Sequence, residues 1–415
     1  MKKLFTLLLL GILHQVTVAQ KTVTLEECES QFLKKNLFLL ASHYNIDASK
    51  ALTIQARIWE NPTITADLNA YNPDRNQLFD IGKMGQKVLG VEQLIYLGGK
   101  KRNEIKLAQK NEELSQLEFD NLLRNLKLEL RESFYTVYYN SKKLETTDKQ
   151  LVHIENLIES YTIQTQKGNI PLKDLVRLQT LFLNLKNERL EIINNTIEEQ
   201  ANLKLLMTEK EIVIPVVSEV DFNRYTQSIL FDIYNLENEA IKNRPDYLFQ
   251  QKNIEANELN VKWQKALAIP DITLGVNYDQ RSGAFNNEAN VSIGIPLPLW
   301  NKNKGNIKYA KTILDQSKIE KQNFELQLRS EVEVKWNKWK EAKKNYLLLK
   351  PSANANFEAV YEGTLLNFQK RNISLLEFTD FMESYNQAKI QLNELKKIVV
   401  LSGEELNSTV NKNLF

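Results

Sequence analysis

Apolar positions recur every three or four residues over most of this chain, and this spacing predicts long amphipathic helices. The first covers residues 25–58, with Thr24 as a suitable N-cap and Asn61-Pro62 as the end. A second helix is predicted from residue 98 to residue 167, because nothing in it after Gly99 is glycine or proline. At about 1.5 Å per residue, it would be on the order of 100 Å long.

Each long stretch reaches a short break and turns back. The first break lies at 168–171 and precedes a predicted return helix at 172–208. Its coiled-coil-like apolar stripe consists of Leu175, Leu178, Phe182 and Leu185. The second long stretch, 306–370, contains Pro351, which should kink or break it, and ends at a second break, 371–374. By the same rise, the return helix and the first helix would measure roughly 55 and 50 Å, so both could stack end to end beside the long helix.

In four places the period changes to alternation of apolar and polar residues, which is typical of a strand with two unlike faces. These strands are expected at about 62–71, 87–96, 270–279 and 288–296. Each is about as long as a tilted strand that crosses a bilayer, roughly nine to eleven residues. Four strands cannot close a barrel alone, and an open sheet edge cannot face lipid, so membrane strands would imply an oligomer. The alternative is two soluble hairpins that pack on the helices.

The same elements occur twice in the same order. Residues 168–175 (Gly-Asn-Ile-Pro-Leu-Lys-Asp-Leu) return as 371–378 (Arg-Asn-Ile-Ser-Leu-Leu-Glu-Phe), and Pro62-Thr63-Ile64-Thr65 returns as Pro270-Asp271-Ile272-Thr273. This pattern indicates an internal duplication of a helix-strand-strand-helix-helix unit. The predicted segments are a signal peptide at 1–19, a first repeat at 20–208, a linking segment at 209–231, a second repeat at 232–402 and a tail at 403–415. Residues 213–217 (Val-Ile-Pro-Val-Val) indicate a small β segment within the link.

The first residues are typical of a secretory signal: two lysines, an apolar core at 4–13 and a small-residue cleavage site at Thr17-Val18-Ala19. A buried helix or a membrane anchor is the alternative, but the apolar run is too short to span a bilayer. The whole chain of 415 residues has a formal charge of +2. Cleavage would remove the two lysines and leave a charge of zero, without the basic excess of a nucleic-acid binder.

Candidate chemistry is sparse. Cys28 is the sole cysteine, so an internal disulfide is impossible, and its surroundings do not match a lipoprotein cleavage site. His43 and His153 have no metal-ligand spacing, and Gly98-Gly99-Lys100-Lys101 lacks the spacing of a phosphate-binding loop. We therefore predict no catalytic residue, no metal site and no cofactor. Two acidic residues stand out instead: Glu377 and Asp380, three apart on one helix face after the second break. On a solvated face they would have no role, whereas on a symmetry axis they would form a ring of charge.

These features together resemble the TolC-type outer membrane factors of efflux systems. The resemblance covers essentially the whole mature chain and rests on the duplication, on residues 168–174, and on 93–100 (Gln-Leu-Ile-Tyr-Leu-Gly-Gly-Lys). Residues 296–305 (Pro-Leu-Pro-Leu-Trp-Asn-Lys-Asn-Lys-Gly) are most similar to the heavy-metal branch, the partners of Czc- and Cus-type RND pumps. The resemblance implies a mainly α chain with a small transmembrane β part. Three chains would form a homotrimer with a twelve-stranded β-barrel in the outer membrane lipid, continued by a long periplasmic α-helical barrel.

The resemblance also implies a function and a set of site residues. The protein would be a passive duct, fed by a periplasmic adaptor and an inner-membrane RND-type pump that supply selection and energy. Glu377 and Asp380 would line the periplasmic aperture, and Asp174 would help to latch the closed state. Family members often place an arginine and a tyrosine near the second tip as latch partners, but Ile373 and Phe368 occupy those places here. The second tip also has arginine in place of the glycine of the first.

The two breaks are the expected surface for a partner hairpin, because loops at element ends commonly carry binding function. These predicted docking residues are Gly168, Asn169, Ile170, Arg371, Asn372 and Ile373. A competing interpretation is an exported coiled-coil scaffold protein without channel activity. The alternation of apolar and polar residues at 289–295 argues against it, because this period of two is typical of strands and not of coiled-coil helices. The cargo, whether metal cations or small toxic compounds, is not encoded in a recognisable motif.

Overall fold

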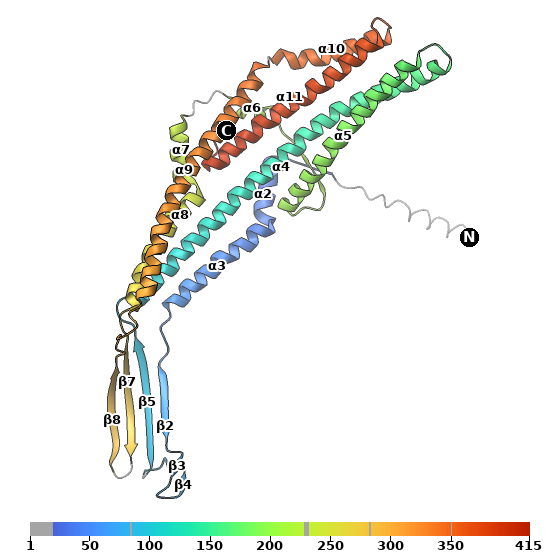
Figure 1. Cartoon of the computed structure of the whole chain (residues 1–415). Coiled ribbons are helices and arrows are strands. Elements are labelled where there is room, and N and C mark those ends of the chain that lie inside the picture. The colour runs from blue at the N-terminus through green and yellow to red at the C-terminus, as the bar shows by residue number, and fades with distance from the viewer. Residues whose placement is uncertain (1–19, 84, 228–231, 282–283, 350) are drawn as a thin grey trace, which may run out of the picture. The chain divides into compact units, whose positions relative to one another are not determined.

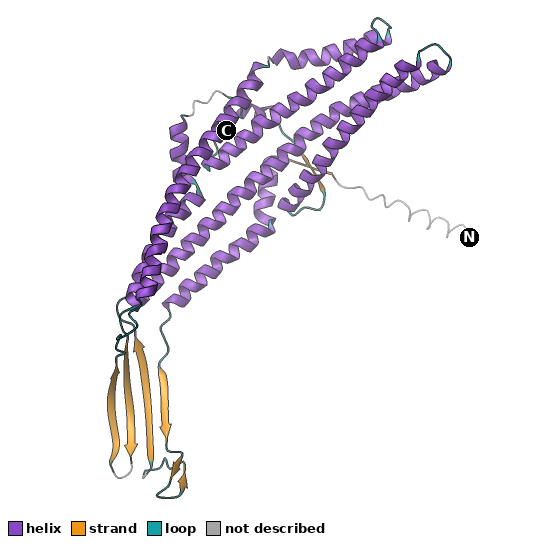
Figure 2. Cartoon of the chain, in the orientation of Figure 1, coloured by secondary structure: helices purple, strands orange, loops and turns teal. Residues whose placement is uncertain are grey.

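The computed structural model describes residues 20–83, 85–227, 232–281, 284–349 and 351–415, and helices predominate in it (Figure 2). The predicted signal peptide, residues 1–19, lies outside these ranges. The chain falls into two compact units. The first combines the segment up to Leu40 with Asn121–Arg244 and Gln327–Phe415, and the second combines Ala41–Asp120 with Pro245–Leu326. Each unit takes segments from both halves of the sequence, so the units differ from the predicted repeats.

The helices follow the predicted order (Figure 1). They are α2 (Leu25–Lys35), α3 (Leu37–Arg57), α4 (Lys100–Gln166), α5 (Leu172–Met207), α6 (Glu219–Arg224), α7 (Ile233–Asn243), α8 (Pro245–Leu267), α9 (Lys304–Leu348), α10 (Pro351–Gln369) and α11 (Leu375–Val410). Helix α4 is continuous over 67 residues. The expected interruption at Pro351 is present, because the proline begins a new helix.

Two predicted helix boundaries were wrong. The helix expected at 25–58 is divided at Asn36, which is fully buried and has extended backbone angles. The Asn36 side chain donates to the Leu206 carbonyl (2.8 Å) and accepts from the amide of Leu39 (3.0 Å). The bond from Leu39 satisfies an amide at the start of α3, and the bond to Leu206 ties the break to α5. The second wrong boundary is the start of the C-terminal tail. It was expected at residue 403, but α11 continues to Val410.

The strands of the described residues form three small sheets. They are β1 (Gln20–Val23), β2 (Thr63–Leu68), β3 (Tyr71–Asn72), β4 (Gln77–Leu78), β5 (Gln86–Ile95), β6 (Ile212–Pro215), β7 (Ile272–Arg281) and β8 (Phe285–Gly294). The largest sheet has the order β2-β5-β7-β8 with every pair antiparallel, and it lies entirely in the second unit. In the first unit, β1 and β6 pair in parallel, and β6 is the small β segment expected within the link.

The two hairpins of the first unit share one hydrophobic core. Helices α4 and α5 form one hairpin, and α10 and α11 form the other (Figure 1). The core residues come from all four helices: Leu151, Ile154, Leu178, Leu181, Leu185, Tyr361, Phe368, Phe378, Met382 and Tyr385. The stripe predicted on α5 therefore packs on the neighbouring helices, as apolar spacing of three and four requires.

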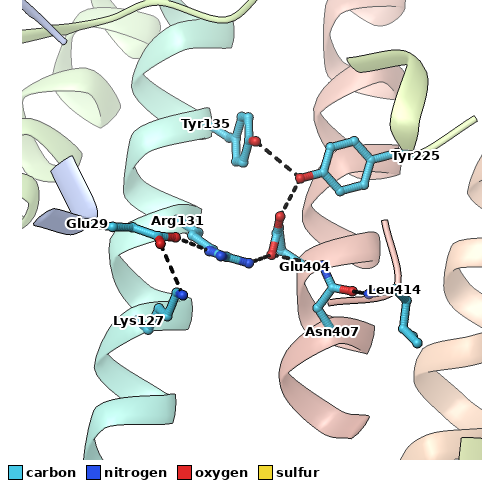
Figure 3. A network of polar contacts seen from close by, with 8 residues as sticks. All are labelled: Glu29, Lys127, Arg131, Tyr135, Tyr225, Glu404, Asn407 and Leu414. Atoms are coloured by element: carbon cyan, nitrogen blue, oxygen red, sulfur yellow. Dashed lines mark hydrogen bonds and ion pairs between the residues drawn. The ribbon is translucent and has the colours of Figure 1, made fainter. Parts of the chain in front are cut away.

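A buried charge network fixes the other end of α11 (Figure 3). Glu404 on α11 is only 3% exposed, and it accepts hydrogen bonds from Arg131 on α4 and from the Tyr225 hydroxyl. Arg131 also donates to Glu29 (2.6 Å), while the Tyr135 and Tyr225 hydroxyls lie 3.2 Å apart. Removing one partner would leave a buried charge unpaired, at a cost of about 3–5 kcal/mol.

The last residues of the chain pack on this network. Asn407 accepts a hydrogen bond from the Leu414 amide (2.8 Å), which folds the chain back after α11. The Phe415 ring then lies 4.9 Å from the ring of Trp339 and 5.5 Å from that of Tyr225. Gly403 provides the room, since a Cβ there would meet Tyr225 at 2.6 Å.

Candidate functional site

The first hairpin tip is built by a helix C-cap. Gly168 has φ +75°, and its amide donates to the Thr165 carbonyl (3.0 Å). The amide of Asn169 donates to the Gln164 carbonyl (3.0 Å), and its side chain donates to the Gln164 side chain (2.8 Å). These two backbone bonds define a Schellman motif, which satisfies the last carbonyls of α4 and reverses the chain.

The second tip has the same geometry without a glycine. Arg371 has φ +61°, and its amide donates to the Phe368 carbonyl (2.9 Å). The amide of Asn372 donates to the Asn367 carbonyl (2.9 Å), and the two asparagine side chains are bonded at 3.2 Å. The arginine therefore occupies the left-handed position that Gly168 occupies in the first tip, at a cost of about 1–2 kcal/mol for a residue with a Cβ.

The helices that leave the two tips begin differently. Helix α11 has a capping box: the Ser374 hydroxyl accepts from the Glu377 amide (3.2 Å), and the Glu377 carboxylate accepts from the Ser374 amide (2.8 Å). Helix α5 begins after Pro171, which makes no side-chain cap. Asp174 occupies the position in α5 that Glu377 occupies in α11, and no capping bond holds its carboxylate.

The predicted aperture residues are both exposed on α11, within one turn of each other. The bonds from Ser374 lower the pKa of the Glu377 carboxyl below its ordinary value. Asp380 lies on the same exposed face, opposite the buried Phe378 and Met382. The pair is thus free to face a lumen, but Glu377 has a structural task at the start of α11 as well.

The latch candidate Asp174 has a neighbour that the sequence did not single out. The charges of Asp174 and Arg371 both act on the hydroxyl of Tyr161 on α4, and burial together with Asp174 raises the pKa of that tyrosine. The Tyr161 ring stacks on that of Phe368 at 6.4 Å, so it joins the two hairpins. Ring stacking between distant segments leaves no periodic signal in the sequence.

The four-stranded sheet of the second unit has one apolar face whose described side chains are largely exposed. A row of paired residues crosses it, and its members are Ile64, Val91, Val276 and Val291. Their exposed fractions are 79%, 50%, 60% and 76%. The next row, on the opposite face, is Thr65, Gly90, Asn277 and Asn290. A sheet in water would bury the aliphatic row and expose the polar one, so this arrangement is typical of strands with lipid on one side.

Amphipathic aromatic residues gather where the strands meet the helices. The rings of Trp59 and Tyr96 lie 5.9 Å apart; Trp59 lies between α3 and β2, and Tyr96 directly follows β5. After β8, Trp300 is 91% exposed and Leu297 is 72% exposed. Tryptophan and tyrosine prefer the boundary between lipid and water.

The described residues contain neither a membrane-spanning helix nor a candidate metal site. None of the described helices is long and apolar enough to cross a membrane. Within the described ranges, no group of three or more His, Cys, Asp and Glu side chains could hold a metal ion.

Comparison with known proteins assigns the family. Residues 29–209 and 236–409 match the outer membrane efflux protein family. The chain belongs to this family. Members work in tripartite systems with an adaptor and an inner-membrane pump, so the protein is an outer-membrane efflux channel component. The coiled-coil scaffold is not favoured.

Individual relatives agree with this assignment. The cobalt-zinc-cadmium resistance protein CzcC of Cupriavidus metallidurans is 20% identical over 372 residues, which cover 89% of this chain and 85% of CzcC. The crystal structure of CusC has a TM-score of 0.73 at 14% identity and covers 93% of this chain and 91% of its own. The Campylobacter jejuni CmeC outer membrane channel has a TM-score of 0.74 at 14% identity, with coverage of 94% and 86%. The predicted family, fold class and location in the outer membrane are thereby confirmed.

Proposed function

We propose that three copies of this chain form a passive duct through the outer membrane, without catalytic activity of their own. The observation that supports this most is the sheet of the second unit. Its apolar face is largely exposed, and its outer strands β2 and β8 each have one edge without a partner among the described residues. Exposed edges cannot face lipid, and three sheets of four strands would close on one another into twelve. The polar face would then line the pore.

Two neighbouring residues of β8 provide a matched test. Val291→Lys places a charge on the apolar face, and Asn290→Lys places the same charge on the polar face. A lysine that faces the bilayer midplane costs about 2–4 kcal/mol, whereas one in a water-filled lumen costs little. We expect Val291→Lys to reduce the amount of trimer in outer-membrane fractions, measured by native mass spectrometry, and Asn290→Lys to keep it. Equal amounts of both variants, or a stable monomer of the parent, would contradict a lipid-facing barrel.

The two tips are proposed as the docking surface for a hairpin of the periplasmic adaptor. Both present an asparagine, Asn169 and Asn372, directly after the left-handed residue. Each side chain is bonded only within its own tip, so the remaining polar capacity of both amides is available to a partner. A pair of similar loops offers one hairpin partner two equivalent contacts.

Glu377 and Asp380 are proposed to form a ring of six carboxylates at the periplasmic entrance of the trimer, with Asp174 as a latch of the closed state. Rings of charged side chains make pores selective for ions of opposite sign. Hydrogen bonds from Ser374 lower the pKa of Glu377, which favours a charged carboxylate at this position.

The ring can be tested in planar bilayers. The double variant Glu377→Gln with Asp380→Asn should show a reduced preference for cations. Divalent cations added on the periplasmic side should also block its current less than they block the parent's. Glutamine still completes a capping box, so the start of α11 is kept. Glu362→Gln on α10 removes one exposed carboxylate elsewhere and is the control. Unchanged selectivity and block in the double variant would show that these residues are only a solvated acidic face.

The cargo is proposed to be metal cations or small toxic compounds, selected by the pump. The similarity to a protein named for cobalt, zinc and cadmium resistance supports the metal cations. Deleting the gene should lower the tolerated concentration of those metals, and the intact gene should restore it. Unaltered tolerance to all three would favour the other cargo class.

A further inference from the structure

A sizeable cavity in the first unit has no part in the proposed duct. It measures about 770 Å³ and lies between α4, α6, α11 and the adjoining ends of α9 and α10. Much of its wall is aromatic: Tyr138, Tyr139, Phe222, Tyr346 and Phe357. This volume is typical of pockets that bind small organic molecules. Polar residues, among them Asn223, Asn345 and Gln391, complete the wall beside the aromatic ones.

The polar groups of the cavity leave one positive charge unmatched. Lys142 has an ion pair with Glu145 (3.3 Å), which lies outside the lining. Lys396, in contrast, makes no hydrogen bond or ion pair with any described residue. Its ammonium lies 5.6 Å from the centre of the Phe222 ring, and Glu219 acts on it only at longer range.

Burial of Lys396 has an energetic consequence. Desolvation lowers its pKa below the ordinary lysine value, which means that the cation lacks the partner that would normally compensate for lost water. An anion in the cavity would supply that partner. The aromatic wall would at the same time cover an apolar body of the same molecule.

We propose that this cavity is a binding site for an amphipathic organic monoanion, a flat apolar body that carries a single carboxylate or sulfonate. The anionic group would bind the Lys396 ammonium, and the apolar body would lie against Phe222, Tyr346 and Phe357. Glu219 at the lining disfavours a second negative charge on the ligand. Such a ligand would join α6 to α11, and the proposal does not depend on what the duct carries.

The experiment uses two probes of equal shape, naphthalene-2-carboxylate and its neutral amide. Binding to the full-length protein in lipid nanodiscs is measured by calorimetry and by saturation-transfer NMR, with empty nanodiscs as background. The parent should bind the carboxylate saturably and more tightly than the amide. Lys396→Gln should weaken carboxylate binding by about tenfold, because hydrogen bonds to charged groups contribute about 1.5–3 kcal/mol. The amide should bind both proteins alike.

Two further variants complete the design. Lys397→Gln, next to Lys396 on α11 but outside the lining, removes a lysine that is paired with Glu394 (2.8 Å) and should leave both probes unaffected. Ala388→Trp fills the cavity and should abolish binding of both. The proposal is overturned if the parent binds neither probe, which would mean that a neighbouring copy or a side chain covers the cavity. It is also overturned if Lys396→Gln and Lys397→Gln bind the carboxylate equally.

Discussion

The two hairpin tips share a backbone and differ in how it is stabilised. Both close α4 or α10 with the same pair of amide-to-carbonyl bonds. The first uses a glycine in the left-handed position and begins α5 at Pro171 without a side-chain cap. The second uses Arg371 in that position and begins α11 with a capping box. An N-cap contributes about 1 kcal/mol, and a left-handed residue with a Cβ costs about 1–2 kcal/mol. The two duplicated loops thus keep one conformation in different ways: the first avoids backbone strain and has no side-chain cap, and the second has a strained residue and a stabilising cap.

The two tips hold their acidic residues, Glu377 and Asp174, in different ways. Glu377 is held by its cap, so part of its hydrogen-bonding capacity is used inside α11. Asp174 makes no such bond and is half-buried beside Tyr161. We infer that the Asp174 carboxylate can form and break contacts with other residues more readily than the Glu377 carboxylate, which is what the proposed latch would need.

The largest expected effect tests what the tips share. Asn169→Arg combined with Asn372→Arg should reduce efflux-dependent resistance to the level of a strain without the gene, because bulk and charge would block the adaptor hairpin. Outer-membrane abundance should stay normal, since both asparagines are exposed. Susceptibility assays and immunoblots of membrane fractions measure the two quantities. Full resistance of this double variant would exclude tip-to-tip docking.

The next effect tests the capping box. Ser374→Ala should destabilise the first turn of α11 by about 1 kcal/mol, which corresponds to roughly fivefold faster exchange of its amides. Pro171→Ala removes no side-chain cap and serves as the control at the first tip. Hydrogen exchange with mass spectrometry resolves the two tips. Similar exchange in Ser374→Ala and the parent would mean that the capping box contributes nothing.

A smaller effect tests the left-handed residues, and its sign should reverse between tips. Arg371→Gly should stabilise the second tip by about 0.5–1 kcal/mol, and Gly168→Ala should destabilise the first by a similar amount. A Cβ at residue 168 meets nothing within 4 Å, so only the backbone conformation is tested there. Local exchange rates are again the measurement, and a change of the same sign at both tips would refute the argument.

The smallest effect is a pH dependence of the second tip alone. The pKa of Glu377 is lower in the folded protein than in the unfolded chain. Its contribution to the stability of the first turn of α11 is therefore fully present above the ordinary carboxyl pKa. It should decline as the pH falls through the lower folded value. Exchange rates normalised for pH should show this decline at the start of α11 and should lose it in Ser374→Ala. Persistence of the decline in that variant would assign it to another group.

Sequence patterns predicted the periodic parts of this fold. The length of α4, the break at Pro351 and the alternating strands are local properties of the chain, and they appear where expected. The division at Asn36 was missed because it depends on a bond to Leu206, far away in sequence. The ion pair of Arg131 with Glu404 and the cavity around Lys396 depend on packing between distant helices in the same way. The two helix breaks that carry the proposed docking residues appear where the sequence predicted them, and the roles proposed for these residues depend on contacts between chains.

The parallel ladder of β1 and β6 has a consequence for biogenesis. Its partners, from Gln20 with Ile212 to Val23 with Pro215, are about 190 residues apart in the chain. The first strand of the exported chain therefore cannot pair until half of the polypeptide has been translocated. During that interval the backbone amides of β1 and the side chain of Val23, which is buried in the folded protein, need protection. Periplasmic chaperones that recognise extended apolar segments should bind this chain before its first unit is complete.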